Sequence, residues 1–368
     1  MKIGIYTFLT KNYGAVLQAF SLYRTVTELC PGASVRIVDF RTARHESISK
    51  IFCRRSDNNL YNLVWQLHIL WHYRELKHRR DAIRDFKNRM DFTARYETIQ
   101  ALLDNPPVMD VHITGSDQVF RPNFEYRDVY YLNFSKGSSR KVAYAPSFGV
   151  NRFTDQEKAY IKSALSDFDA LSCRERSGAE FMHELLGKPV FHALDPVFLT
   201  SQTEWRSVAV EPNINDDYMF VYCLKDVSRL LEYARLLYPG RQIVLLAPNN
   251  LRHYSGCKQL FYPGPQEFIG LIDNAAAVVT DSFHGTAFSI IFRKEFRTVI
   301  TRPEVSSRIE SLLGSLGLED RIMTESVKTG VKPLAEHEYS SKLAEMIESS
   351  REYLRTSLQL KSESHETE

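Results

Sequence analysis

The run Val278-Val279-Thr280-Asp281-Ser282-Phe283-His284-Gly285-Thr286-Ala287-Phe288 decides the fold of this chain. The β-favouring residues at its start predict a buried strand, and the apolar residues after Thr286 predict a buried helix that starts near Gly285. The turn between them points backbone N–H groups and the imidazole of His284 into one crevice. Because a helix N-terminus carries partial positive charge and unpaired donors, this crevice suits an anion. The alternative is that His284 only caps the helix.

Strand and helix patterns alternate in both halves of the chain. A strand over residues 2–7, a helical pattern after it and a strand over residues 35–39 predict a β–α–β unit, the opening of a parallel doubly wound sheet. The alternation starts again near residue 217. We therefore expect an α/β fold with two Rossmann-like domains. The expected parts are an N-terminal domain over 1–200 with a basic helical insertion at about 45–100, a C-terminal domain over 205–330, a helix over 334–360 and a disordered tail over 361–368.

The composition excludes several classes of protein. A hydrophobic content of 43% and a charged content of 25% are ordinary for a globular protein, and a formal charge of +2 argues against a nucleic-acid binder. The N-terminus lacks the apolar region of a signal peptide, and no segment approaches about 18 uninterrupted apolar residues, so we expect no membrane span. Five scattered cysteines without a Cys-x-x-Cys fit neither a disulfide framework nor a zinc cluster and predict the cytoplasm.

A basic and apolar segment over residues 50–90 interrupts the alternation. Its apolar stripe lies beside Trp65 and is surrounded by arginines and lysines. A basic amphipathic helix of this kind can lie on an anionic membrane surface. The alternative is a helical insertion packed on the N-terminal domain with a solvated basic face. The stripe consists of Leu60, Leu63, Val64, Leu67, Leu70 and Trp71.

Three polar turns follow predicted strands of the first domain, at residues 12–14, 115–118 and 147–149. All three fall at the C-terminal edge of a parallel sheet, where ligands bind in open α/β folds. They would line one crevice and face His284 across the domain cleft. The alternative for each turn is simple loop capping. Asp195, which precedes a proline, is either a site residue of second rank or a turn at the domain junction.

Arg174 and Arg176 follow a strand predicted over residues 169–173. The pattern Ser177-x-x-Glu180 matches a capping box, as does Thr154-x-x-Glu157, so helices should begin at both places. Both guanidinium groups would then lie at the end of a strand and beside a helix N-terminus, where they suit a phosphate or a carboxylate. The alternative is an ordinary surface pair between an arginine and Glu175.

Taken in order, these blocks resemble the polysaccharide pyruvyl transferase family over about residues 1–325. Members of that family transfer the enolpyruvyl group of phosphoenolpyruvate to sugar hydroxyls, usually as a cyclic pyruvate ketal. Their fold resembles that of GT-B glycosyltransferases, in which a C-terminal helix often crosses back to the first domain. Many members carry Arg-Leu-His where this chain has Ser282-Phe283-His284, so an expected cation is missing here. The blocks are residues 12–19, 115–120, 144–149, 174–178, 195–198, 264–289 and 306–309.

The resemblance implies a pyruvyl transferase acting on a polysaccharide or its lipid-linked precursor. Phosphoenolpyruvate would be the co-substrate, with no cofactor, no metal and no nucleic acid. The enzyme would be cytoplasmic and could lie on the inner face of the membrane. One alternative is a nucleotide-sugar-dependent GT-B glycosyltransferase, and another is a non-catalytic binding protein on the same fold.

Ketal formation needs an acid and a base, and a histidine serves either role near neutral pH. We therefore expect His284 to be the acid/base, assisted by Asp117 or Asp281. Arg174, Arg176 or Arg308 would replace the missing family arginine. The residues expected to bind phosphoenolpyruvate are Arg174, Arg176, Ser282, Gly285, Thr286 and Arg308. The residues expected to bind the acceptor sugar are Asn12, Tyr13, Gly14, Ser116, Gln118 and Ser147.

Overall fold

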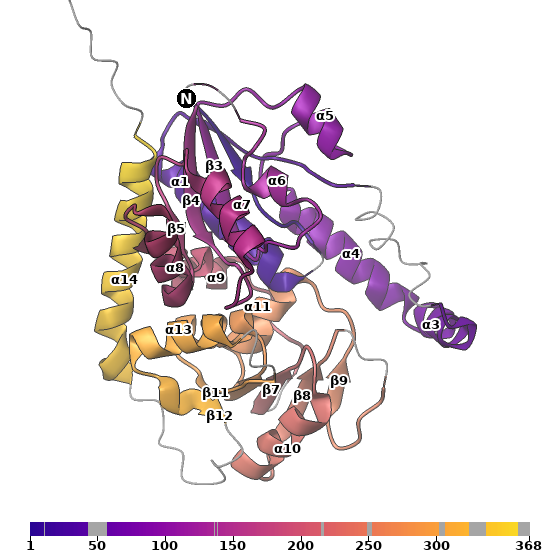
Figure 1. Cartoon of the computed structure of the whole chain (residues 1–368). Helices are drawn as coiled ribbons and strands as arrows, with labels where there is room; N and C mark the ends of the chain where they lie inside the picture. The colour runs from indigo at the N-terminus through magenta and orange to yellow at the C-terminus, as the bar shows by residue number, and fades with distance from the viewer. Residues whose placement is uncertain are drawn as a thin grey trace, which may run out of the picture.

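Two parallel sheets, one in each half of the chain, form the framework of the protein (Figure 1). Helices cover them, and the long C-terminal helix runs beside both halves. The computed structural model describes residues 1–10, 12–42, 57–135, 137, 139–214, 217–248, 252–301, 306–323 and 336–359. The tail expected to be disordered, residues 361–368, lies outside these ranges.

The first half is built on a four-stranded parallel sheet. Its elements are β1 (Lys2–Tyr6), α1 (Tyr13–Leu29), β2 (Ser34–Ile37), α3 (Asn59–Trp71), α4 (Tyr73–Lys87), α5 (Ile99–Asp104), β3 (Val111–Asp117), α6 (Arg127–Tyr130), β4 (Arg140–Pro146), α7 (Asp155–Leu165), β5 (Ser172–Cys173), α8 (Arg176–Leu186), β6 (Phe191–His192), η1 (Pro196–Leu199) and α9 (Gln202–Val208). The strand order is β2-β1-β3-β4, and the short β5-β6 pair follows through a bridge between Ala170 and Val142. The direction in which successive strands are added to the sheet therefore reverses between β1 and β3, which is the switch point of this sheet.

The second half is built on a six-stranded sheet, again parallel in every pair. Its elements are β7 (Tyr218–Tyr222), α10 (Val227–Leu237), β8 (Gln242–Leu246), β9 (Lys258–Leu260), α11 (Pro265–Asp273), β10 (Ala277–Thr280), α12 (Phe283–Ile291), β11 (Glu295–Val299), α13 (Ser307–Leu316), η3 (Glu319–Arg321), β12 (Ile322–Met323) and α14 (Glu336–Ser357). The order β12-β11-β10-β7-β8-β9 is that of a doubly wound dinucleotide-binding fold, with its switch point between β7 and β10.

The C-terminal helix α14 returns to the first half of the chain (Figure 1). The Tyr353 hydroxyl donates a hydrogen bond to the carbonyl of Ala143 in β4, at 2.9 Å, and its ring stacks on Phe191 with centroids 5.0 Å apart. Arg351 donates to the carbonyl of Leu199 at 3.2 Å. The expected doubly wound α/β architecture with a returning helix is therefore confirmed.

Tyr13 joins the two halves at the start of α1. Its ring stacks on Phe268 of α11 with centroids 4.8 Å apart, and its hydroxyl donates to the carbonyl of Pro263 at 2.7 Å. Burial raises the pKa of Tyr13 to about 12. The expectation that Tyr13 contacts the acceptor sugar is wrong, because its hydroxyl is buried between the two halves and already donates to Pro263.

The two predicted capping boxes have different outcomes. Thr154 caps α7, and Glu157 bonds back to it, as the pattern predicted. In contrast, α8 begins at Arg176 rather than after Ser177, and its N-cap is Glu175. The Glu175 carboxylate turns inward, where it accepts hydrogen bonds from the Ser147 hydroxyl and the thiol of Cys173. A tertiary contact therefore overrides the local capping pattern.

The predicted insertion lies outside the described residues up to residue 56. Between residues 57 and 90 it forms the helices α3 and α4, and its apolar stripe faces away from the core. Trp65 and Ile69 are buried on one side of α3, whereas Leu67 and Trp71 are exposed on the other. The alternative of a packed helical insertion therefore holds for the inner side of α3 and not for its outer side. Among the described helices, none combines the length and apolar character needed to cross a membrane.

Candidate functional site

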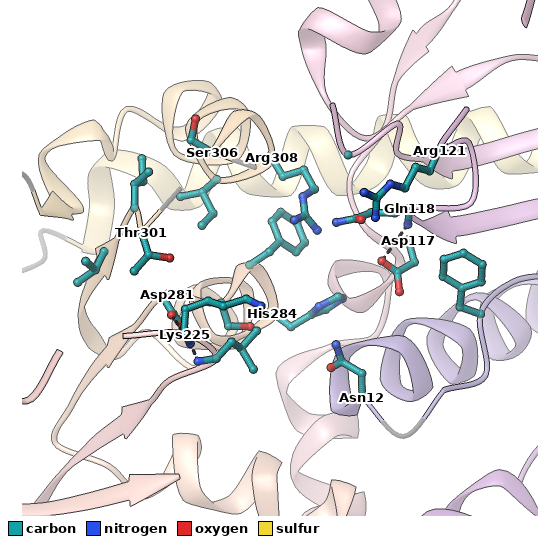
Figure 2. A pocket seen from close by; sticks show the side chains of 18 of the residues that line it. Asn12, Asp117, Gln118, Arg121, Lys225, Asp281, His284, Thr301, Ser306 and Arg308 are labelled. Atoms are coloured by element: carbon teal, nitrogen blue, oxygen red, sulfur yellow. Dashed lines mark hydrogen bonds between the residues drawn. The ribbon is translucent and has the colours of Figure 1, made fainter. Parts of the chain in front are cut away.

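A cavity of about 440 Å³ opens between the carboxyl edges of the two sheets (Figure 2). Its volume is within the range of small-molecule binding sites. Loops that follow β1, β3 and β4 line it from the first half, and loops that follow β7, β10 and β11 line it from the second. The switch points of both doubly wound sheets thus face the same space. Its polar lining includes Thr10, Asn12, Asp117, Gln118, Arg121, Lys225, Asp281, Ser282, His284, Thr301, Ser306 and Arg308.

His284 lies in the first turn of α12, which begins two residues earlier than the sequence suggested. Ser282 is the N-cap and accepts a hydrogen bond from the backbone N–H of Gly285 at 3.3 Å. His284 is therefore not the cap, and its side chain extends into the cavity toward Asn12 and Asp117 (Figure 2). A Cβ atom at Gly14 would lie only 2.0 Å from Nδ1 of His284. The polar turn of the first half thus needs glycine at Gly14 because the imidazole packs directly against its backbone.

Asp195 is the buried carboxylate beside His284. One of its oxygens accepts hydrogen bonds from Arg174 at 2.6 Å and from Ser116 at 3.0 Å. The same oxygen lies 3.7 Å from Nε2 of His284, which is an electrostatic contact rather than a hydrogen bond. Burial by itself would raise the pKa of Asp195, but His284 and Arg174 together hold that pKa well below its usual value. Asp195 therefore remains a carboxylate and orients the imidazole.

Arg174 lies beneath the cavity rather than in its wall. Its guanidinium is buried over the ring of Phe283 at 4.6 Å, and Nη2 lies 4.0 Å from the Asp117 carboxylate. Burial works to lower the pKa of Arg174, but Asp195 and Glu175 raise it above its usual value. Arg174 thus stays charged and neutralises Asp195.

Asp117 stands at the end of β3 with a φ of 74°, in the left-handed region that most side chains avoid. Such backbone strain concentrates at functional sites, where the surrounding structure holds it in place. Its carboxylate accepts a hydrogen bond from the N–H of Gln118 at 2.9 Å and lines the cavity.

Asp281 also lines the cavity, but both of its oxygens are engaged. They accept hydrogen bonds from the backbone N–H groups of Leu224 at 2.7 Å and Lys225 at 2.9 Å. These bonds connect the turn after β10 to the loop after β7. Burial raises the pKa of Asp281. Its carboxylate therefore mainly shapes the loop, and Asp117 is better placed for chemistry.

Three cationic side chains line the cavity: Arg121, Lys225 and Arg308 (Figure 2). Arg308 donates to the amide oxygen of Gln118, at 3.0 Å from Nη1 and 2.9 Å from Nη2. Burial lowers the pKa of Arg308, and the positive charge of Arg174 lowers it further. Its Nε is buried without a hydrogen-bond partner among the described residues. A cation that is desolvated and repelled in this way favours a bound anion.

Several of the predicted site residues do not line the cavity: most pack against residues that do, and one lies at a separate surface depression. Arg176 is exposed and borders a separate surface depression with His183 and His192, so it is not brought to the cavity. Gly285 packs against Thr280, where a Cβ would lie 2.5 Å from the threonine hydroxyl. The remaining support residues are Thr286, bonded to Ser282 and Thr298, Ser116, bonded to Asp195, and Ser147, bonded to Glu175.

The sequence reasoning ranked Asp195 second and did not select Arg121, Lys225 or Thr10. The only local signal for Asp195 is its position before a proline that starts η1. Nothing in the sequence around Arg121 or Lys225 distinguishes them from surface residues, because each meets the cavity through the packing of the two halves.

The family model of the polysaccharide pyruvyl transferases matches residues 12–302, which is most of the chain. The chain belongs to the polysaccharide pyruvyl transferase family. The matched region contains the three cavity-lining turns of the first half, Asp195 and the His284 turn. Arg308 lies just beyond it. The resemblance noted from the sequence is confirmed, and the family implies a transferase with a saccharide acceptor.

Solved structures align with this pyruvyl transferase family member over most of their length at low sequence identity. A protein from Listeria monocytogenes assigned as a UDP-N-acetylglucosamine 2-epimerase aligns with a TM-score of 0.50 and 9% identity, over 96% of this chain and 90% of that one. The UDP-GlcNAc 2-epimerase of Methanocaldococcus jannaschii aligns with a TM-score of 0.49 and 15% identity, over 95% and 93%. The glycosyltransferase SnogD from Streptomyces nogalater aligns with a TM-score of 0.41 and 12% identity, over 96% and 95%. No curated protein matches the chain.

We expect Gly14→Ala to displace His284 and to lower turnover about 100-fold, since a shift of about 1 Å in a catalytic group has an effect of that size. The check is a crystal structure of the variant together with its turnover. Gly314→Ala is the matched control, because an added methyl there meets only an ordinary contact at 3.6 Å. Equal turnover in both variants would show that the Gly14 contact does not position His284.

We expect Asp195→Asn to destabilise the fold by about 3–5 kcal/mol, because it leaves Arg174 buried without its carboxylate. Urea denaturation measures this loss, and Asp217→Asn, which breaks an exposed pair with Arg241, should cost about 1 kcal/mol or less. The low folded-state pKa of Asp195 stabilises the protein above the ordinary aspartate pKa, near 4, and this contribution disappears as pH falls through the folded pKa. The difference from the wild type should therefore narrow below about pH 4, and a constant difference would contradict the assignment.

Proposed function

We propose that this protein transfers pyruvate from phosphoenolpyruvate to a sugar of a polysaccharide or its lipid-linked precursor, as a cyclic ketal. The observation that carries the proposal is the meeting of three cations and His284 in one cavity of about 440 Å³. Phosphoenolpyruvate carries a phosphate and a carboxylate on three carbons, so its site needs more than one cationic group close together. Arg308, Arg121 and Lys225 meet that need.

Arg308 is the best candidate for the cation that the family motif lacks in this chain. Where many members have an arginine two residues before the histidine, this chain has Ser282, whose hydroxyl caps α12. Arg308 instead comes from α13 and reaches the same cavity as His284. We assign it to the phosphate or carboxylate of the donor. The partial positive charge at the N-terminus of α12 would also favour an anion there.

The reaction requires three proton transfers and the loss of phosphate. A sugar hydroxyl adds to C2 of phosphoenolpyruvate and loses its proton to a base, while C3 gains a proton and becomes a methyl group. The bond from C2 to the phosphate oxygen then breaks, and phosphate leaves with the electron pair. A second sugar hydroxyl adds to C2 and loses its proton, which closes the ketal ring.

His284 is the proposed general acid/base for these steps. The Asp195 carboxylate lies 3.7 Å from its Nε2, and a positioned histidine can give or take the protons that these steps require. Asp117 lies on the other half of the cavity and is the proposed second proton-transfer group. Asp281 is the weaker candidate because its oxygens already accept two backbone hydrogen bonds.

The acceptor sugar is assigned to the wall contributed by the first half. Asn12 and Gln118 line the cavity there and offer short, directional donors and acceptors for sugar hydroxyls. A lipid-linked acceptor would place the enzyme on the cytoplasmic face of a membrane.

We expect phosphoenolpyruvate to stabilise the folded protein by about 2.7 kcal/mol when it is present at about 100 times its dissociation constant. Thermal unfolding with and without the ligand measures this effect. Pyruvate, which lacks the phosphate, serves as the control and should stabilise the protein less. A shift with UDP-N-acetylglucosamine and none with phosphoenolpyruvate would favour the glycosyltransferase alternative and reject the proposal.

We expect His284→Gln and Arg308→Gln to affect different kinetic constants. Loss of the acid/base should lower kcat by about 10²–10⁴-fold with phosphoenolpyruvate binding largely kept. Loss of the Arg308 charge should mainly raise KM for phosphoenolpyruvate, because it removes an anion contact. Phosphate release in the presence of lipid-linked saccharides measures both constants, and near-normal kcat in His284→Gln with a lowered melting temperature would mean that the histidine is structural.

A further inference from the structure

The outer side of α3 is an exposed apolar surface on an uncharged helix. Its sequence, NLYNLVWQLHILW, has no acidic or basic residue except the histidine at position 68. Trp71 is 85% exposed and Leu67 is 57% exposed, whereas Trp65 and Ile69 on the inner side are buried. A helix on the surface of a globular domain normally exposes polar side chains instead. The outer residues, called here the α3 patch, are Leu60, Leu63, Val64, Leu67, Leu70 and Trp71.

The α3 patch lies at the outer end of α4, away from both sheets (Figure 1). Apolar residues scattered singly on a surface need no explanation, but a contiguous exposed patch of large side chains marks an interaction site. Its position at the tip of a helical arm allows it to meet a flat partner without interference from either domain.

Basic side chains follow the α3 patch directly. Arg74, Lys77 and Arg80 are exposed on the first half of α4, with Glu75 as the exposed acidic residue among them. Tyr73 is also exposed at the junction of the two helices. An apolar helix face with tryptophan and tyrosine at its edge and basic residues beside it complements a surface that is apolar inside and anionic outside. A second copy of this chain would bring its own basic arm to the same place.

The arm is braced against both halves of the protein near the cavity. His78 of α4 contacts the carboxylate of Glu267 in α11 at 2.8 Å, and His68 of α3 contacts the hydroxyl of Tyr262 at 2.7 Å. Lys87, at the inner end of α4, donates to the carbonyl of Leu9 at 2.8 Å. Leu9 lies between two cavity-lining residues, Phe8 and Thr10. The orientation of the arm is therefore coupled to the mouth of the cavity.

From these contacts we infer that the α3 patch docks the protein on an anionic lipid surface, with α3 lying in the interfacial plane. Because α4 connects the patch to the loop at Leu9, docking presents the cavity to molecules anchored in the same membrane. This coupling deepens the proposed function, since it rests on a lipid-linked acceptor, but the docking itself does not require that chemistry.

The test is co-sedimentation of the full chain with vesicles that contain phosphatidylglycerol, at low and high salt. We expect the wild type to pellet at low salt and to be released as salt rises, because the basic residues are screened. The variant Leu67→Glu with Trp71→Glu should bind at least about tenfold more weakly, since it removes two large apolar contacts. Its melting temperature should stay near that of the wild type, because both side chains face outward.

The matched control places the same charges on other exposed apolar positions. Val108→Glu with Leu236→Glu changes side chains that are also exposed but lie outside the arm, and it should bind vesicles as the wild type does. A wild type that stays in the supernatant at low salt, or an α3 variant that pellets normally, overturns the inference. If the wild type binds neutral phosphatidylcholine vesicles as strongly as phosphatidylglycerol vesicles, the inference that the surface must be anionic is wrong.

Size-exclusion chromatography tests whether a second copy of this chain, rather than a membrane, covers the α3 patch. If the wild type is a dimer that the α3 variant converts to a monomer, and vesicles are not bound, the patch is a self-association surface and the inference fails. Neither measurement uses phosphoenolpyruvate, so failure of membrane docking and failure of pyruvyl transfer are separable outcomes.

Discussion

The arrangement of the site depends on the buried carboxylate of Asp195. A charge removed from water is tolerated only when it is paired and hydrogen-bonded, and Asp195 meets this requirement through Arg174, Ser116 and the backbone N–H of Val197. These partners all come from the first half of the chain, whereas His284 approaches from the second half and faces the oxygen that Arg174 and Ser116 bond. Asp195 therefore links the first half of the chain to the imidazole of His284 at the boundary between the halves.

The cavity exists only because two doubly wound sheets present their switch points to each other. At a switch point the loops after neighbouring strands diverge, which leaves a crevice at the carboxyl edge of the sheet. In this chain one crevice is bordered by Asn12 and Asp117 and the other by Lys225 and Asp281. Neither crevice alone has the full set of charged side chains that line the cavity. The returning helix α14 and the Tyr13 contact hold the halves in register, so the geometry of the site is a property of the interface.

The sequence was most informative where structure is local. Strand and helix patterns, the Thr154 capping box and the ordered blocks of the family all predicted features that are confirmed. It was misleading where a tertiary contact competes with a local pattern. Glu175 turns inward and shifts the start of α8, which sends Arg176 to the surface instead of the cavity. The apolar stripe of α3 was correctly seen, but periodicity alone cannot tell which side of a two-sided apolar helix meets the core.

By itself, the sequence determined the doubly wound α/β class, the family and the strand–turn–helix unit that contains His284, because hydrophobic periodicity and turn chemistry act over a few residues. Only the tertiary structure decided which polar groups face the cavity. Arg174 follows a strand and Arg308 lies at the start of a helix. Arg174 is buried and bonded to Asp195, whereas Arg308 lines the cavity. That division depends on burial and on charges contributed by residues far away in the chain, and long-range electrostatics and packing leave no signature in the local sequence.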